Sequence, residues 1–141
     1  MAQELRRLEL PAEMSSLGRL MGFVLEGARA AALPERQQGH LELVLEEVLV
    51  NVMRYAYADG ESGSIEVGYA VEGPGTVFVQ VSDAGRPFDP LAKEPPDLRL
   101  GIADRPIGGL GVFLVKEVTE SLTYTRKENR NTLSFRIRSS P

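Results

Sequence analysis

The chain has 141 residues, of which 43% are hydrophobic and 26% charged, with a formal net charge of −4 and no cysteine. This length and composition predict one compact soluble domain with its own hydrophobic core. The absence of cysteine excludes disulfides, thiol nucleophiles and cysteine-ligated metal sites, and the negative net charge argues against direct binding to nucleic acid. A charged N-terminus, and no apolar run near the roughly 20 residues that a bilayer requires, predict a cytoplasmic protein that does not contact a membrane.

The first part of the chain predicts a strand followed by two helices. Residues 4–10, ELRRLEL, form a short candidate strand that ends at Pro11. Apolar residues at helical spacing predict one helix over 12–33, which Pro34 stops, and a second helix over 35–58.

Alternating apolar residues in the rest of the chain predict two β-hairpins. The segments SIEVGYAV at 64–71 and TVFVQVS at 76–82 alternate with a period of two and are joined by the turn EGPG. The segments SLTYTRK at 121–127 and TLSFRIR at 132–138 flank the turn ENRN in the same way.

A long irregular segment separates the two hairpins. Residues 84–108 contain five prolines, and loops of this length in compact domains are usually functional lids or disordered segments. A third helix is predicted from Gly109 to about Glu120. This order of elements predicts an α+β domain in which helices cover one face of a sheet.

The second predicted helix carries a polar stripe, because Glu47, Asn51 and Tyr55 are spaced i, i+4, i+8. Asparagine is unfavourable inside a helix because its side-chain amide competes for the hydrogen bonds of the backbone. An asparagine inside a helix therefore suggests a functional role. An amide oxygen can bind a hard cation, and a carboxylate one turn earlier can orient or deprotonate a nucleophile. Arg54 could reach phosphate oxygens. A polar helix edge facing water is the alternative for the same residues.

Another candidate lies in VSDAGRPFDP, where Asp83 ends a predicted buried strand and Gly85 follows two residues later. A carboxylate at the end of a strand can accept a hydrogen bond from an exocyclic amine such as that of adenine. A nearby glycine lets a ligand approach the backbone. An ordinary Asp-x-Gly turn is the alternative.

The third candidate is the glycine cluster of PIGGLG, with Gly108, Gly109 and Gly111 at the start of the third helix. Unpaired N–H groups and the helix dipole favour phosphate at such a position. Neither usual phosphate loop is present, because no G-K-[ST] occurs and Leu114 stands where a third glycine is required. A hinge without a ligand is the alternative.

In order and spacing, the three motifs resemble those of the GHKL superfamily, the Bergerat-fold ATPases and kinases. Glu47…Asn51 resembles the N box, Asp83-Ala84-Gly85 the first glycine box, and Gly108-Gly109-Leu110-Gly111 the second. The resemblance covers roughly residues 5 to 138.

This resemblance implies a fold and a domain organisation. The fold is a two-layer α/β sandwich with a mixed, mostly antiparallel sheet covered on one face by helices. A single ATP-binding domain occupies residues 1–141, with an ATP lid at about 86–108.

Within the superfamily, NVMRYAY and DAGRPFDP are most similar to the small bacterial anti-sigma-factor serine/threonine kinases of the RsbW type. The resemblance implies that Asn51 coordinates Mg²⁺, that Glu47 is the general base toward a substrate serine, and that Arg54 touches phosphate. It implies that Asp83 binds the adenine amine and that Thr132 supports the adenine through water. The other implied nucleotide-binding residues are Gly85, Gly108, Gly109, Leu110 and Gly111.

The resemblance also implies partners. Members of the family phosphorylate a serine on a STAS-domain anti-anti-sigma protein and bind a sigma factor, and a homodimer through the N-terminal strand and first helix is expected on the same basis. The alternatives are a non-catalytic, ATP-gated module that binds a partner protein, and a structural interaction domain without a nucleotide.

Overall fold

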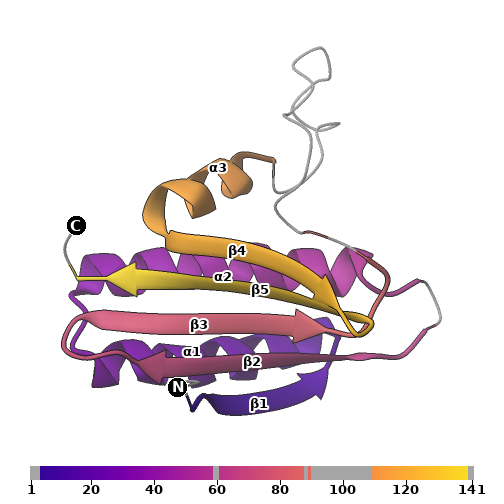
Figure 1. Cartoon of the computed structure of the whole chain (residues 1–141), viewed down its shortest axis with the longest axis horizontal. Helices are drawn as coiled ribbons and strands as arrows, with labels where there is room; N and C mark the ends of the chain where they lie inside the picture. The colour runs from indigo at the N-terminus through magenta and orange to yellow at the C-terminus, as the bar shows by residue number, and fades with distance from the viewer. Residues whose placement is uncertain (1–3, 59–60, 88, 90–108, 140–141) are drawn as a thin grey trace.

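The structure, a computed structural model, describes residues 4–58, 61–87, 89 and 109–139 (Figure 1). Its elements in chain order are β1 (Arg6–Pro11), the 3₁₀ helix η1 (Met14–Ser16), α1 (Leu17–Ala30), α2 (Glu35–Tyr55), β2 (Ser64–Val71), β3 (Thr76–Asp83), α3 (Gly109–Val118), β4 (Glu120–Lys127) and β5 (Arg130–Arg138). In this described part of the chain, no helix is long and apolar enough to cross a membrane.

The five strands form one sheet in the order β1-β2-β3-β5-β4. The expected α+β class is confirmed, but the expectation of a mixed sheet is not met, because every adjacent pair of described strands is antiparallel. The connectivity explains this difference. β3 and β4 run in the same direction, as a crossover through a helix requires, but β5 lies between them and is antiparallel to both.

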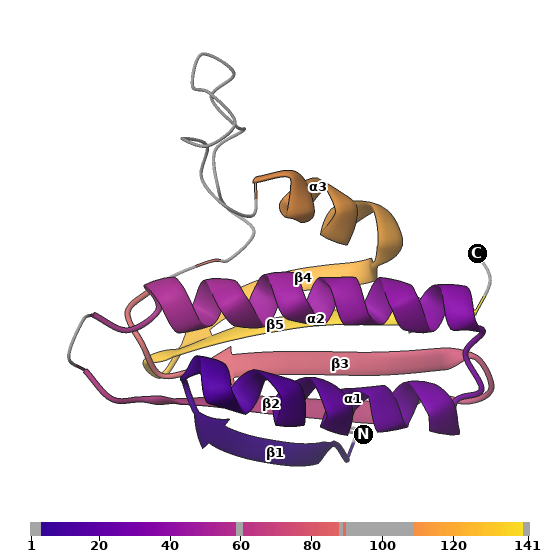
Figure 2. The ribbon, with the colours of Figure 1, turned by 180° about the vertical axis from the view of Figure 1, so that it is seen from behind.

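Helices cover one face of this sheet. α1 and α2 lie side by side on that face, and α3 lies next to α2 near the β4 edge (Figures 1 and 2). Most helix-facing residues of the three central strands are apolar and buried, as the alternating pattern predicts, and the exceptions Asp83 and Asn131 are polar but also buried. The fully buried side chains of the core include Leu20, Val24, Leu41, Leu45, Leu49, Ile65, Val67, Val77, Phe135 and Ile137.

The first helix is shorter than the predicted span of 12–33. Glu13 has an extended backbone, and η1 then turns the chain from the edge strand into α1. At the other end, Ala32 adopts a positive φ of 56°, which ends the helix before Pro34.

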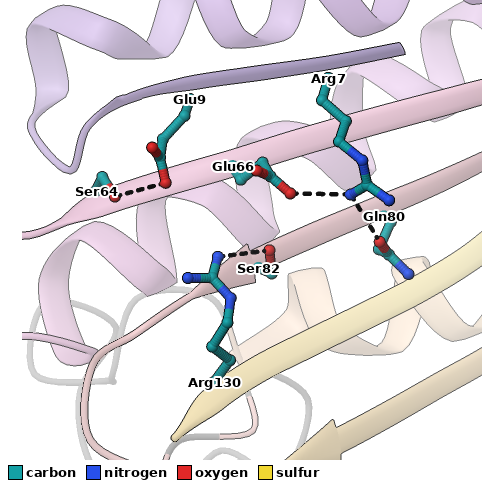
Figure 3. A network of polar contacts seen from close by, with 7 residues as sticks. All are labelled: Arg7, Glu9, Ser64, Glu66, Gln80, Ser82 and Arg130. Atoms are coloured by element: carbon teal, nitrogen blue, oxygen red, sulfur yellow. Dashed lines mark hydrogen bonds and ion pairs between the residues drawn. The ribbon is translucent and has the colours of Figure 1, made fainter. Parts of the chain in front are cut away.

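The opposite face of the sheet is polar (Figure 3). Arg7 of β1 donates to Glu66 of β2 at 2.9 Å, and Ser64 donates to Glu9 at 3.1 Å. Across the central strands, Arg130 of β5 donates to Ser82 of β3 at 3.1 Å. The core therefore lies wholly between the sheet and the helices, and a buried ligand site has to be sought in that layer.

Candidate functional site

The polar stripe of α2 is built around a buried asparagine. Asn51 is 4% exposed, and its Nδ2 atom donates to the main-chain oxygen of Glu47 at 2.8 Å and to the Glu47 carboxylate at 3.1 Å. These bonds turn the amide nitrogen toward Glu47, which is itself partly buried. The amide oxygen is the atom of Asn51 with the chemistry to coordinate a hard cation. Arg54, one turn later, is exposed.

The strand-end carboxylate predicted for the adenine amine is also buried. Asp83 is the last residue of β3 and is 2% exposed. Its Oδ1 atom accepts two hydrogen bonds, from the main-chain N–H of Gly85 at 2.9 Å and from Nδ2 of Asn131 at 2.9 Å. A carboxylate this deeply buried is held only where donors compensate the lost hydration.

A small cavity brings α2 and the end of β3 together. Its walls are the side chains of Val48, Val52, Val81, Asp83, Tyr124, Asn131 and Leu133. Val48 and Val52, the chain neighbours of Glu47 and Asn51, bring α2 against this space, although Glu47 and Asn51 themselves are not among the described residues that line it. The cavity has a volume of about 10 Å³, which holds roughly one water molecule. A purine therefore enters only if the rim opens.

A larger hollow of about 470 Å³ lies at the other end of α2, between Arg36, His40, Glu117 and Arg138. None of the residues predicted from the motifs lines it. The small cavity is the better candidate site, because it combines aliphatic walls with a buried carboxylate, the arrangement typical of ligand pockets.

Gly85 has a packing role that the sequence does not reveal. A Cβ atom at this position would lie 2.1 Å from the main-chain oxygen of Ala56. That oxygen accepts a hydrogen bond from the N–H of Arg86 at 2.8 Å, while Nε of Arg86 donates to the oxygen of Tyr55 at 2.6 Å. These contacts occupy the carbonyls at the end of α2, which ends at Tyr55 instead of the predicted residue 58.

Thr132 does not lie where the resemblance implied. In the pairing of β3 with β5, Thr132 is opposite Ser82, and Asn131 is opposite Asp83. Because successive residues of a strand point to opposite faces, Thr132 lies on the outer polar face, away from the cavity. The prediction that Thr132 supports the adenine is therefore corrected, since Asn131 is the residue of β5 that lines the cavity.

The glycine cluster is described only in part. α3 begins at Gly109, as predicted, so Gly109, Leu110 and Gly111 form its first turn. α3 packs beside α2, the helix of Glu47 and Asn51. Gly108 and residues 90–108 of the expected lid lie outside the described residues.

The described residues contain no group of three or more histidine, cysteine, aspartate or glutamate side chains that could hold a metal ion. A cation at this site would thus depend on few protein ligands. The donor set still fits Mg²⁺, which is usually held by one or two protein oxygens together with water and substrate phosphates.

Comparison with protein families and curated proteins gives concordant matches. A family model described as a histidine kinase-like ATPase domain matches residues 10–137. The serine-protein kinase RsbW of Listeria monocytogenes is 32% identical over 122 residues, which cover 82% of this chain and 75% of that protein. The serine/threonine-protein kinase BtrW of Bordetella bronchiseptica is 27% identical over 101 residues, covering 72% of this chain and 70% of that protein.

Solved structures with a similar fold come from a blue-light activated histidine kinase of Erythrobacter litoralis. One structure of this kinase and one of its histidine kinase domain both align with a TM-score of 0.57 at 22% identity. The alignments cover 89% and 99% of this chain but 41% and 66% of those chains. At 22% identity, this structural similarity shows a shared fold and nothing more specific.

Proposed function

This chain belongs to the family of histidine kinase-like ATPase domains, and from that premise we propose that it is an ATP-dependent serine/threonine protein kinase of the anti-sigma-factor class. The proposal includes transfer of the ATP γ-phosphoryl group to a serine of a STAS-domain anti-anti-sigma protein. It also includes sequestration of a sigma factor. The relatives RsbW, a serine-protein kinase, and BtrW, a serine/threonine-protein kinase, support the choice of a serine as acceptor.

One observation carries the nucleotide-binding part of the proposal: the buried carboxylate of Asp83 lines an aliphatic cavity whose walls include Val48 and Val52 of α2, the helix that also carries the buried amide of Asn51. Asp83 has the chemistry to accept a hydrogen bond from the adenine amine, and Val48, Val52 and Val81 provide apolar surfaces for the base. A ligand that carries an amine on a flat apolar ring matches both features.

We propose the following roles in phosphoryl transfer. Glu47 accepts the proton of the attacking serine hydroxyl while the serine oxygen bonds to the γ-phosphorus and ADP leaves. Asn51 supplies an oxygen ligand for Mg²⁺, which when bound neutralises phosphate charge. Arg54, exposed at the end of α2, contacts phosphate oxygens. The first turn of α3 provides backbone N–H groups toward the phosphates.

The alternative is a module that binds ATP and a partner without transferring phosphate. Nucleotide binding needs Asp83 and Asn51, whereas transfer also needs the general base Glu47. Both functions require bound ATP, so binding data alone do not separate them.

Transfer of labelled phosphate separates the two functions. The purified chain is incubated with Mg²⁺ and γ-labelled ATP together with a STAS-domain protein encoded by the same genome, and with a variant of that protein whose acceptor serine is alanine. The kinase proposal predicts label on the first protein and none on the second. ATP binding without any transfer would favour the binding module.

A further inference from the structure

Asn131 of β5 is a hub of hydrogen bonds next to the candidate adenine site, and it is 3% exposed. Its Nδ2 atom donates to Oδ1 of Asp83 at 2.9 Å and to the main-chain oxygen of Arg86 at 2.8 Å. Its Oδ1 atom accepts from the Tyr124 hydroxyl at 2.5 Å and from the Arg126 guanidinium at 3.3 Å. One buried amide thereby connects β3, β4 and the segment after Asp83.

The partners fix which way round this amide lies. The main-chain oxygen of Arg86 can only accept, so it must face the amide nitrogen. The guanidinium of Arg126 can only donate, so it must face the amide oxygen. If the amide were reversed, its nitrogen would face the Arg126 guanidinium and its oxygen would face the main-chain oxygen of Arg86. Donor would then face donor and acceptor would face acceptor, and buried polar groups without hydrogen bonds are destabilising.

This fixed amide orients the carboxylate of Asp83. Both hydrogen bonds that Asp83 makes with the described residues, from Gly85 and from Asn131, end on Oδ1. The other oxygen, Oδ2, is therefore the atom that can accept from a ligand. The terminal torsion of aspartate is broad, so donors on one oxygen are needed to hold the second in place.

Arg126 extends the same cluster to the backbone, because it also donates to the main-chain oxygen of Gly85 at 2.7 Å. Tyr124 and Arg126 are two residues apart on β4 and both reach Asn131. The edge strand thus supports both the carboxylate and the turn that follows it.

We propose that Asn131, held by Tyr124 and Arg126, is a positioning residue that sets Asp83 to recognise the adenine amine and thereby determines base selectivity. The inference rests on the proposed ATP binding. Adenine presents an amine to the carboxylate, whereas guanine carries a carbonyl at that ring position, which would face Oδ2 as a second acceptor. A fixed carboxylate rejects the wrong group more strongly than one that can rotate away.

The test is titration of wild type, Asn131→Leu and Tyr124→Phe with Mg-ATP and with Mg-GTP. Asn131→Leu keeps the side-chain volume but removes the amide, so the ATP affinity and the ATP/GTP affinity ratio should both fall by about tenfold. Tyr124→Phe removes one supporting hydroxyl and should lower the ratio by roughly two- to fivefold. Thr132→Val, next in the chain but on the outer face, is the matched control and should leave the ratio unchanged.

The outcomes distinguish this inference from the proposed function. Wild-type protein that binds no ATP would contradict the proposed function itself. Wild-type protein that binds ATP, with an unchanged ratio in Asn131→Leu, would overturn the inference alone. An equal loss of ATP and GTP affinity would mean a structural role and would overturn it too. If circular dichroism shows that Asn131→Leu is unfolded, Tyr124→Phe decides, and an unchanged ratio there counts against the inference.

Discussion

Replacing Glu47 with glutamine should separate phosphoryl transfer from nucleotide binding. In the structure, one side-chain oxygen of Glu47 accepts from Nδ2 of Asn51 at 3.1 Å. Glutamine keeps an oxygen and the same shape at this position, so Asn51 remains oriented and the ATP affinity should stay within a few-fold of wild type. The amide cannot accept the serine proton, and loss of a general base lowers the rate by roughly 10²–10⁴.

The assay is single-turnover transfer of γ-labelled phosphate to the STAS-domain protein, beside a calorimetric ATP titration of the same variant. Glu46→Gln is the matched control, since Glu46 is exposed and lies about 100° around the helix. It should transfer at the wild-type rate. Wild-type transfer by Glu47→Gln would refute the assignment of the base, and slow transfer by Glu46→Gln would redirect it to the neighbour.

Two further predictions concern glycines. Gly27→Ala places a Cβ atom 2.5 Å from the ring of Tyr69 and should lower the free energy of unfolding by about 1–3 kcal/mol. At Gly22 a Cβ atom would meet nothing within 4 Å beyond its chain neighbours and the nearby backbone of its own helix, so Gly22→Ala should raise the free energy of unfolding by up to about 1 kcal/mol. Urea denaturation measures both, and equal stabilities would contradict the packing argument. Gly85→Ala meets a backbone oxygen at 2.1 Å and should weaken both folding and ATP binding, so wild-type values in both measurements would show that the turn is not tightly packed.

Much of the fold could be predicted because apolar periodicity records which face of an element is buried. Val77, Val79 and Val81 alternate on β3, and all three are buried. The sheet order was beyond this reasoning, since alternation reveals a buried face but does not identify the neighbouring strand. The insertion of β5 between β3 and β4, which makes every described pair antiparallel, leaves no local signal in the sequence.

The residues of the candidate site, too, can be predicted from the sequence only in part. Asn51 and Asp83 stand out in the sequence because polar residues interrupt buried stretches, and both are buried. Asn131 falls in the predicted turn ENRN and so does not stand out as a site residue, whereas in the structure β5 begins at Arg130. The alternation of Leu133 and Phe135, extended back by two residues, is the signal that places Asn131 on the inner face and Thr132 on the outer one.

The contact of Gly85 with the end of α2 could not be foreseen either, because it joins residues far apart in the chain. The residues alone leave a ligand and an ordinary Asp-x-Gly turn as alternative reasons for this glycine, and the family resemblance implies the ligand. The structure gives a packing reason as well, because a Cβ atom at Gly85 would clash with the main-chain oxygen of Ala56. A ligand beside Gly85 stays a prediction.

The most direct test of ATP binding at Asp83 and Asn51 is calorimetric titration of wild type, Asp83→Ala and Asn51→Ala with ATP, with and without Mg²⁺. Each substitution removes a polar contact worth about 1.5–3 kcal/mol, so we expect saturable, Mg²⁺-dependent binding by wild type and an affinity lower by about tenfold or more in both variants. Wild-type affinity in both variants, or no binding by wild type, would contradict the account.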